Sequence, residues 1–550
     1  MNLLKKISLY WHTIRYLKWI QIHSRLKQKI YSPRIKWSHF LELEVRKVDG
    51  VWLGSIPSKQ SVVESGEFVF LGKSGKLTDI NWNGSERDKL WRYNQHYFND
   101  LNAIESLSRQ SWHLEMLNDW VKQNPPNYGV GWEPYPLSIR VVNWIKWGLA
   151  GNSIPELCMQ SLVMQVRCLE KKIEWHLLGN HLLANAKALI FSGVYFKGSE
   201  AKKWLKLGLE ILKTQIPEQI LEDGGHFELS PMYHSIILED LLDLINLSQT
   251  FQNQIELSFI LTLKNTAKNM LEWLLCMIHP DGQIALFNDA AFGISAAPRD
   301  LIKYADNLNI IYDKLQNFNS GIKHLKSSGY VRIKLDQVIA ILDVAPIGPD
   351  YLPGHAHADT LSFELSIYGQ RIVVNGGTSL YGSSPERLRE RETKFHSTVE
   401  INNENSSEVW SGFRVARRAY PFGLNIDSGN NIIYVGCSHN GYARLKSNPI
   451  HRREWFMSKH NLTIVDSVVG GAYKSIARYI LHPQISVQVL NEREWCLYAP
   501  SGKKFTVEVL EGDGAITMTS YAPEFGVKVQ THCIEVNMRL GRSEVRFNWQ

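Results

Sequence analysis

The stretch GHAHADTLSFELSI, residues 354–367, has two histidines and an aspartate at every second position, directly before an alternation of apolar and polar residues. Alternate side chains of a strand lie on one face, so His355, His357 and Asp359 are predicted to share a face with the apolar residues that follow. A face that changes from apolar to histidine and aspartate within one strand is typical of a core that opens into a reactive site.

The apolar pattern differs on the two sides of this region. From about residue 94 to 310, apolar residues recur at helical spacing, as in 204–212. Farther on, short alternating runs take over, such as YVRIKL at 330–335 and FTVEV at 505–509. This separation indicates an α+β protein with a helical domain followed by a domain of antiparallel strands, and the boundary is expected near residues 315–328.

Composition and charge exclude several classes of protein. The chain has 550 residues, and 61 Lys and Arg against 54 Asp and Glu give a net charge of +7. No polybasic block or zinc-finger pattern is present, so we expect no nucleic-acid partner, whereas an acidic polysaccharide is compatible with the mild positive charge. The six cysteines form no CxxC pair and indicate neither a disulfide framework nor a zinc ribbon.

The first 31 residues are basic and aromatic and lack the apolar core and cleavage site of a secretory signal. We therefore expect a cytoplasmic location, with a periplasmic one left open. No stretch of about 18 apolar residues predicts a membrane span. The start of the chain is interpreted as a partly exposed helical arm, and contact with a membrane surface is the alternative.

Two predicted helix starts carry unusual polar groups. In GNHLL, residues 179–183, Asn180 has the position of an N-cap. In GHFELSPMYH, residues 225–234, Ser230 is the expected cap, and Tyr233 falls in the first turn. The partial positive charge at a helix start lowers the cost of a phenolate, so Tyr233 is a candidate acid or base. A plain cap at Asn180 and a buried structural tyrosine are the alternatives.

These motifs, together with FHSTV at 395–399, LWRYNQHYF at 90–98 and WEPYP at 132–136, resemble the heparinase II/III-type polysaccharide lyases in kind and in order. The resemblance covers about residues 80–480. It implies an N-terminal incomplete (α/α) toroid followed by a C-terminal antiparallel β-sandwich, with the substrate cleft between them. The corresponding division of the chain is an arm and domain entry at 1–90, a toroid at 91–320 and a β-sandwich at 325–550.

The resemblance also implies β-elimination at a uronic acid of an acidic polysaccharide such as a glycosaminoglycan. In that reaction Asn180 neutralises the uronate carboxylate, while Tyr233 and His355 act as acid and base. Which of the two is the base stays open, because it depends on the configuration at C5. His181 is a second candidate for the carboxylate role. The residue types suit the chemistry, because the C5 proton is acidic enough only when the neighbouring carboxylate is neutralised.

In such relatives a metal in the β domain is held by positions that correspond here to His357, Asn375 and His396. One structural divalent ion, zinc or calcium, is therefore a possibility that the resemblance raises, and no organic cofactor is expected. Asn375 departs from the pattern because a neutral amide is a weaker zinc ligand than a carboxylate. The alternatives are that Asp359 replaces Asn375 as the third ligand, or that these residues form a hydrogen-bonded cluster without metal.

Arginines between residues 381 and 396 form a polar stretch that we predict to be a loop over the cleft, with Arg387 and Arg391 as candidates for binding uronate or sulfate groups. A solvated charged face is the alternative.

Two other functions stay open. A hydrolase on the same toroid would need paired carboxylates, for which Glu228 and Asp289 are the candidates. The second alternative function is that of a catalytically silent glycan-binding protein of exopolysaccharide assembly. Oligomeric state is not predicted.

Overall fold

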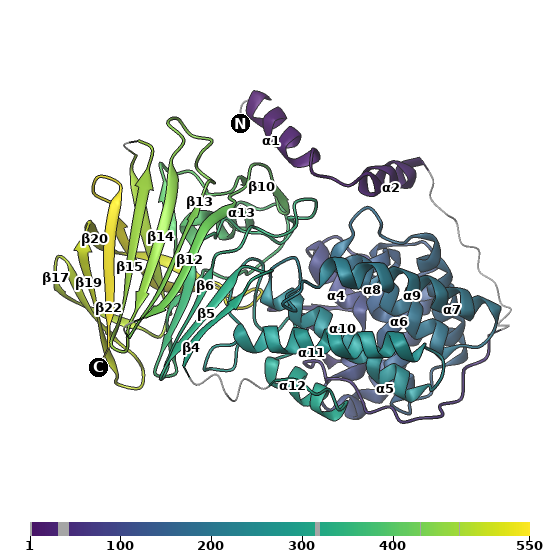
Figure 1. Cartoon of the computed structure of the whole chain (residues 1–550). Helices are drawn as coiled ribbons and strands as arrows, with labels where there is room; N and C mark the ends of the chain where they lie inside the picture. The colour runs from purple at the N-terminus through teal and green to yellow at the C-terminus, as the bar shows by residue number, and fades with distance from the viewer. Residues whose placement is uncertain (1–2, 31–42, 314–319, 430, 472, 550) are drawn as a thin grey trace.

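The computed structural model describes residues 3–30, 43–313, 320–429, 431–471 and 473–549. In these residues helices prevail up to residue 307, and antiparallel strands prevail from residue 321 onward. The two regions lie side by side in Figure 1. The prediction of an α+β chain, with helices first and antiparallel sheets second, is confirmed.

The helical region is built around α8 (Gly179–Tyr195), in which every side chain except that of His181 is buried. A helix that is buried on all sides needs neighbours all round it, and α8 packs against the helices before and after it in the chain. No described helix combines the length and the apolar character that a membrane crossing requires. The other helices are α3 (Leu77–Ile80), α4 (Lys89–Tyr97), α5 (Gln110–Gln123), α6 (Pro134–Leu149), α7 (Glu156–Lys171), α9 (Ser199–Gln219), α10 (Pro231–Thr250), α11 (Leu257–Cys276) and α12 (Pro298–Asn307).

Short elements complete this region. A small antiparallel sheet precedes the helices, and brief 3-10 turns connect some of them. The strands of the small sheet are β1 (Val62–Glu64), β2 (Glu67–Phe70) and β3 (Lys73–Lys76), and the turns are η1 (Asn99–Asn102), η2 (Ser106–Arg109) and η3 (Val130–Trp132).

The β region contains two large antiparallel sheets. The first has the order β20-β21-β16-β8-β7-β6-β5-β4, with β9 also paired to β16, and the second has the order β12-β13-β14-β15-β22-β19-β18-β17. The strands of the first sheet are β4 (Gly321–Leu325), β5 (Tyr330–Leu335), β6 (Val338–Asp343), β7 (Phe363–Ile367), β8 (Gln370–Val374), β9 (Val399–Ile401), β16 (Ser475–Leu481), β20 (Asp513–Tyr521) and β21 (Val529–Asn537). Those of the second are β12 (Pro421–Gly429), β13 (Ile432–His439), β14 (Ile450–Met457), β15 (Asn461–Val469), β17 (Ser486–Asn491), β18 (Glu494–Tyr498), β19 (Lys504–Glu511) and β22 (Arg542–Asn548).

Apolar side chains from both sheets form one continuous core, which includes Phe363 of the first sheet and Trp455 of the second. A buried ion pair joins neighbouring strands of the second sheet. Arg453 Nε and Nη2 lie 2.7 and 2.9 Å from the two carboxylate oxygens of Asp466, and His451 Nε2 lies 2.7 Å from Asp466 Oδ1. Such a pair avoids the penalty of a lone buried charge because each group compensates the other.

The arm consists of α1 (Leu3–Ile14) and α2 (Trp19–Ile30). In Figure 1, α1 lies over the β region, near the short strand β10 (Val409–Trp410) and helix α13 (Pro385–Glu390), whereas α2 lies over the helical region. Trp410 Nε1 donates to Thr13 Oγ1 at 3.1 Å, and Gln28 Nε2 lies 2.8 Å from His176 Nδ1. The arm therefore bridges the two regions.

The stretch from His355 to Asp359 is not a strand, so the prediction that its two histidines and aspartate share one strand face is wrong. β7 begins only at Phe363, and Leu361 before it has a left-handed backbone with φ of 64°. The N–H of His357 donates to Asn288 Oδ1 at 2.9 Å instead of to a neighbouring strand. This segment therefore takes its backbone partners from other parts of the chain, and its two imidazoles meet the same carboxylate, that of Asp289, His355 through Nδ1 and His357 through Nε2.

Candidate active site

Tyr233 and His355 lie in direct contact where the helical and β regions meet. Their rings are stacked, with centroids 3.8 Å apart and planes at 29°. Tyr233 is in the first turn of α10, and its N–H donates to the Ser230 hydroxyl at 3.2 Å. The predicted cap at Ser230 and the first-turn position of Tyr233 are therefore confirmed.

The Tyr233 hydroxyl lies 3.0 Å from the hydroxyl of Tyr381. Burial, followed by the neighbouring Tyr381 and Asp289, raises the pKa of Tyr233 well above its usual value of 10. The expectation that the helix start favours the phenolate is therefore wrong for the free protein, because loss of water outweighs the helix dipole. Tyr233 is held as a neutral phenol, which is a proton donor.

The His355 ring lies between two carboxylates. Its Nδ1 is 2.8 Å from Asp289 Oδ2, and its Nε2 is 3.5 Å from Glu228 Oε2. An ionised Asp289 fixes the proton of a neutral His355 on Nδ1, so that Nε2 presents its lone pair. Burial raises the pKa of Glu228, which also accepts a hydrogen bond from the N–H of Asn180. The His355 side chain is 13% exposed, whereas those of Asp289 and Glu228 are 0% and 2% exposed, so His355 is the member of this group that a ligand can reach.

The sequence had indicated that Asn180 caps α8. Asn180 is instead the second residue of this helix. Leu178, with a left-handed φ of 64°, holds the cap position. Among the described residues, no side chain or backbone group hydrogen-bonds to the Asn180 side-chain amide, which leaves its N–H groups free for a ligand. A Cβ at the preceding Gly179 would lie 2.7 Å from Glu228 Oε1, so glycine permits the close approach of this carboxylate to the helix start.

His181 lies next to Asn180 but faces other partners. Its Nδ1 is 3.1 Å from Glu174 Oε1, and its ring centroid is 4.4 Å from that of Tyr135. Burial would lower the pKa of His181, but the carboxylate of Glu174 outweighs it and raises that pKa. The charged form of the His181 imidazole is therefore favoured, and this residue follows Asn180 in the first turn of α8.

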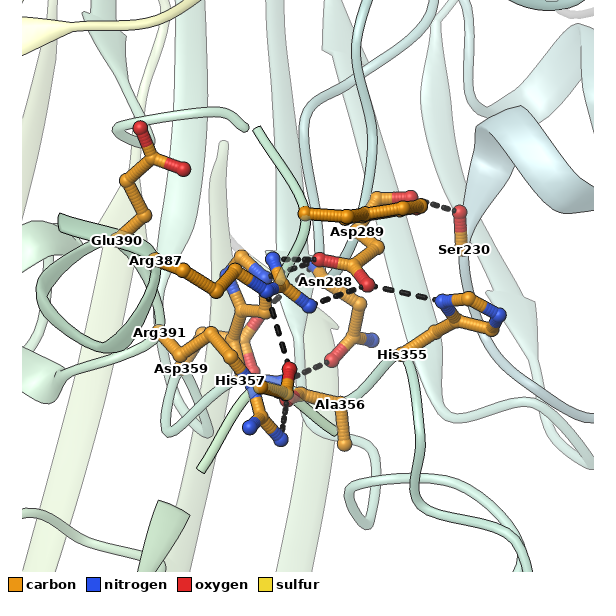
Figure 2. A network of polar contacts seen from close by, with 12 residues as sticks. Ser230, Asn288, Asp289, His355, Ala356, His357, Asp359, Arg387, Glu390 and Arg391 are labelled. Atoms are coloured by element: carbon orange, nitrogen blue, oxygen red, sulfur yellow. Dashed lines mark hydrogen bonds and ion pairs between the residues drawn. The ribbon is translucent and has the colours of Figure 1, made fainter. Parts of the chain in front are cut away.

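Asp289 connects the site to the β region (Figure 2). Arg387 Nη2 lies 2.6 Å from its Oδ2, Arg387 Nη1 pairs with its Oδ1, and His357 Nε2 lies 2.8 Å from Oδ1. Burial alone would raise the pKa of Asp289, but Arg387 and the imidazoles hold it well below the usual range. Asp289 is thus a permanently ionised support for His355.

The predicted loop over the cleft is wrong, because the arginines lie on and after α13. Arg387 is fully buried by its pairing with Asp289. Arg391 is also fully buried and donates to the carbonyl oxygen of Ala356 at 2.9 and 3.0 Å. Both guanidiniums hold the segment around His355 in place, and neither is free to bind a uronate or sulfate group.

Two of the three candidate metal ligands, His357 and His396, lie in contact, whereas the Asn375 amide is engaged with other residues. His357 Nδ1 is 3.2 Å from His396 Nε2, which is a hydrogen-bonding distance. The Asn375 amide oxygen accepts from the N–H of Ser397 at 3.2 Å, and its nitrogen donates to Ser362 Oγ at 3.3 Å. No group of three His, Cys, Asp or Glu side chains in the described part of the chain is placed to hold a metal ion. Two imidazoles and an engaged neutral amide do not fit zinc or calcium. Asp359 does not complete the set, since its Oδ2 accepts from the N–H of Asn288 at 3.0 Å.

Sequence reasoning missed the supporting role of Asp289 and the presence of Tyr381 and Phe413. The Phe413 ring lies 6.2 Å from that of His355 and 5.2 Å from that of Tyr381. The run FNDA at 287–290 carries a signal, a carboxylate next to an amide in an irregular segment, but the side-chain partners of the Asp289 carboxylate lie 66 or more residues away. Tyr381 and Phe413 carry no local signal.

Comparison with known proteins places this chain in a family. The model for the heparinase II/III N-terminus matches residues 59–313, and the model for the heparinase II/III-like C-terminal domain matches residues 319–550. A heparin-sulfate lyase of Bacteroides stercoris is 24% identical over 482 residues, which are 76% of this chain and 67% of that protein. One of Pedobacter heparinus is 25% identical over 388 residues, which are 64% of this chain but 55% of the relative's length.

Solved structures show the same fold. A crystal structure of heparinase III has a TM-score of 0.68 at 19% identity, over 85% of this chain and 78% of the other. A heparan sulfate lyase mutant from Pedobacter heparinus has a TM-score of 0.58 at 18% identity, over 96% and 87%. The predicted incomplete (α/α) toroid followed by an antiparallel β-sandwich is thereby confirmed. With both family models matched in order along nearly all of the chain, the protein belongs to the heparinase II/III family.

Proposed function

We propose that the protein is a polysaccharide lyase that cleaves a uronic-acid-containing glycan by β-elimination. The observation that carries the proposal is the stacked pair of Tyr233 and His355, in which one residue presents a lone pair and the other a proton. Elimination requires a base for the C5 proton and an acid for the leaving O4 oxygen, both on groups that contact the same sugar linkage.

His355 is the proposed base. Its Nε2 takes the C5 proton, and the resulting imidazolium is stabilised by the ionised Asp289 on Nδ1. Asn180 and a protonated Glu228 supply donors to the uronate carboxylate while charge develops on it.

Tyr233 is the proposed acid. Its raised pKa keeps the hydroxyl protonated, and Tyr381 at 3.0 Å stabilises the phenolate that forms when the proton passes to O4. The C4–O4 bond then breaks, and the electron pair of the C5–H bond becomes the C4–C5 double bond. Neither water nor a covalent enzyme intermediate enters this step.

The geometry disfavours hydrolysis by Glu228 and Asp289. Both carboxylates contact the same imidazole, and Asp289 is fully buried in its pairing with Arg387. A hydrolase needs its two carboxylates open to the linkage or to water, and Asp289 is open to neither.

The substrate class is proposed from the family. The named relatives are heparin-sulfate lyases, so heparan sulfate and other glycosaminoglycans come first, followed by uronate-containing exopolysaccharides. A cytoplasmic location stays a prediction, which fractionation of native cells tests.

The test is a screen of the purified protein against heparan sulfate, chondroitin sulfate, alginate and polygalacturonate. Elimination produces a double bond conjugated with the uronate carboxylate, so the ultraviolet absorbance rises as cleavage proceeds. Release of reducing ends without this absorbance would indicate hydrolysis, and binding without cleavage would indicate a silent glycan-binding protein.

Variants assign the activity to the site. Tyr233→Phe and His355→Ala are each expected to lower kcat at least about a hundredfold, which is the usual size of an acid–base contribution. Tyr128→Phe and His460→Ala are matched controls at exposed positions and should keep full activity. Full activity in the first two variants would overturn the assignment.

A further inference from the structure

The arm, residues 3–30, combines basic and exposed apolar side chains. It contains no Asp or Glu, and the charge of its Lys and Arg residues equals the net charge of the whole protein, +7. Of the tryptophans in the described residues, only Trp11 and Trp19 are exposed, at 65% and 73%. The family models begin at residue 59, so they do not account for this surface. The basic residues are Lys5, Lys6, Arg15, Lys18, Arg25, Lys27 and Lys29.

One side of α1 is docked on the β region. Leu9 is buried, and Thr13, four residues later on the same face, accepts a hydrogen bond from Trp410, as described above. The ring of Tyr10 lies 4.9 Å from that of Trp410, with the planes at 73°. Leu9 and Thr13 therefore mark the inner face of α1.

The opposite side of α1 is apolar and open to solvent. Its side chains are spaced by four, four and three residues, which places them on one helical stripe. Successive residues of a helix are turned by about 100°, so this stripe is centred on the side away from Leu9 and Thr13. The stripe consists of Leu3, Ile7, Trp11 and Ile14, each of which is at least half exposed.

α2 is divided in the same way. On its inner face, Gln21 is almost completely buried and donates to the carbonyl oxygen of Tyr351 at 3.3 Å. Gln28, seven residues later on the same face, contacts His176, as described above. The outward face is again apolar, with side chains spaced by seven and four residues that are more than half exposed. They are Trp19, Leu26 and Ile30.

The two apolar stripes lie on the same side of the molecule. In Figure 1, α1 and α2 lie along its upper edge, and each helix docks on the body by its inner face. Both stripes therefore point away from the body. Each helix has 12 residues, whereas a membrane crossing needs about 20, so this surface suits contact with a bilayer and not insertion across it.

Cations flank the apolar surface. At helical spacing, Lys27 and Lys29 fall on the two sides of the α2 stripe. Lys5 and Lys6 of α1 are exposed. Of the basic residues in the arm, only Lys18 forms an ion pair with an acid in the part of the chain that the structure describes. An apolar stripe with tryptophan, flanked by cations that have no acidic partner, is typical of a helix that lies among the headgroups of an anionic bilayer.

Two other occupants fit this surface less well. An acidic glycan offers anions but little apolar surface, so it would leave both stripes in water. A second copy of the chain in a twofold contact would bring two arms of the same positive charge together, and they would repel each other. A bilayer that contains anionic lipid covers the stripes and neutralises the cations at once.

We propose that the arm docks the protein on the surface of an anionic lipid bilayer, with the outward stripes of α1 and α2 among the headgroups. The arm contacts Tyr351, four residues before His355, so docking holds the candidate active site near the lipid surface. This inference goes beyond the proposed function and does not depend on it, because it concerns binding to lipid alone.

The experiment measures sedimentation of the full chain with lipid vesicles. Vesicles of phosphatidylcholine with about one third phosphatidylglycerol should bind the protein at least about tenfold more tightly than vesicles of phosphatidylcholine alone. W11S/W19S removes two outward apolar side chains and should weaken binding to the anionic vesicles at least about tenfold. L107S/L257S removes two exposed apolar side chains outside the arm and is the matched control, which should bind like the wild type.

K27Q/K29Q tests the charge. This variant should also lose at least about tenfold in affinity for the anionic vesicles, because each cation near an anionic surface adds to binding. Added salt should weaken binding of the wild type for the same reason. The control K202Q/K203Q removes two exposed cations from α9 and should leave binding unchanged.

Three results would overturn the proposal. They are a wild type that stays in solution with anionic vesicles, equal binding to both kinds of vesicle, and binding that neither arm variant weakens. A dimer in light scattering that W11S/W19S dissociates, without any binding to vesicles, would assign the surface to a second copy of the chain instead. The substituted side chains are exposed, and an unchanged Tm shows that a loss of binding is not a loss of folding.

The proposed function fails on different grounds. Wild-type protein that binds anionic vesicles but never produces the ultraviolet absorbance with any glycan would refute the lyase and keep the lipid surface. Cleavage by a protein that binds no vesicle would do the reverse.

Discussion

Asp289 Oδ2 lies 2.8 Å from His355 Nδ1, and the same carboxylate is held from the other side by the guanidinium of Arg387. Asp289→Asn is therefore expected to lower kcat by a factor of about 10² to 10⁴, because an amide neither fixes the Nδ1–H tautomer nor stabilises the imidazolium. The variant also leaves Arg387 as an unpaired buried charge, which costs about 3–5 kcal/mol of folding free energy. Steady-state kinetics and urea unfolding measure the two effects.

Asp300→Asn, at a partly exposed carboxylate in α12, is the control for Asp289→Asn. It should change neither kcat nor the unfolding midpoint. Wild-type kcat in a folded Asp289→Asn protein would show that His355 needs no anionic partner.

Tyr381→Phe tests the hydroxyl pair. The hydrogen bond from Tyr381 to Tyr233 is expected to contribute about 1 kcal/mol to phenolate stabilisation, so kcat should fall about fivefold. This is a much smaller loss than that expected for Tyr233→Phe. Equal losses in the two variants would instead make Tyr381 the proton donor, and single-turnover kinetics distinguishes these results from slow product release.

Gly179→Ala tests the approach of Glu228 to the start of α8. The new Cβ would meet Leu352 Cδ2 at 2.5 Å and Glu228 Oε1 at 2.7 Å in a backbone of φ 55°. We expect a loss of about 1–3 kcal/mol of folding free energy together with a fall in kcat/KM, because Glu228 is displaced. Gly282→Ala has a positive φ of 79° but no atom within 4 Å of its Cβ, so it should lose stability through strain alone and keep its activity.

Asp466 makes stability depend on pH. Burial would raise its pKa, but Arg453 and His451 outweigh burial and hold the pKa at about 2, below the ordinary value of 3.8. A depressed pKa stabilises the folded state above about pH 4, and this contribution is lost as the pH falls toward 2. Asp466→Asn should therefore cost about 3–5 kcal/mol at pH 7 and less at pH 3.

Urea unfolding at the two pH values checks the Asp466 prediction, with Asp427→Asn on the exposed strand β12 as the control. A difference between wild type and Asp466→Asn that is the same at pH 7 and pH 3 would contradict it.

Asn375→Asp tests why the histidine cluster does not fit a metal. An aspartate would add a charged oxygen ligand beside His357 and His396, so this variant is expected to bind zinc, whereas the wild type should not. Metal analysis after dialysis against zinc, and the shift of Tm on adding a chelator, measure the effect. Stoichiometric zinc in the wild type would show that two imidazoles and the Asn375 amide suffice.

The order of helices and strands was predictable because apolar periodicity directly reflects which faces are buried. Ser230 and Tyr233 were also predictable, since a cap and a following proline act within one turn of helix. The conformation of His355 to Asp359 was not, because its backbone hydrogen bonds come from Asn288 and Arg391, residues remote in sequence.

The burial of the arginines could not be predicted either, because it depends on partners that are remote in sequence. Arg387 reads as a surface charge within its own polar stretch, and only its partner Asp289, 98 residues earlier, makes burial favourable. Asn180 lies two positions after the actual cap, because Leu178 adopts a left-handed backbone that its residue type does not indicate.

The bridging position of the arm has a thermodynamic consequence. Gln21 of the arm donates to the carbonyl oxygen of Tyr351, four residues before His355, so a glycan that orders this segment and the docked arm stabilise each other by the same free energy. Glycan should therefore protect the amides of α2 from hydrogen exchange and slow proteolysis of the arm. Residues 3–30 are then harder to displace from the body of the protein when an acidic glycan is bound.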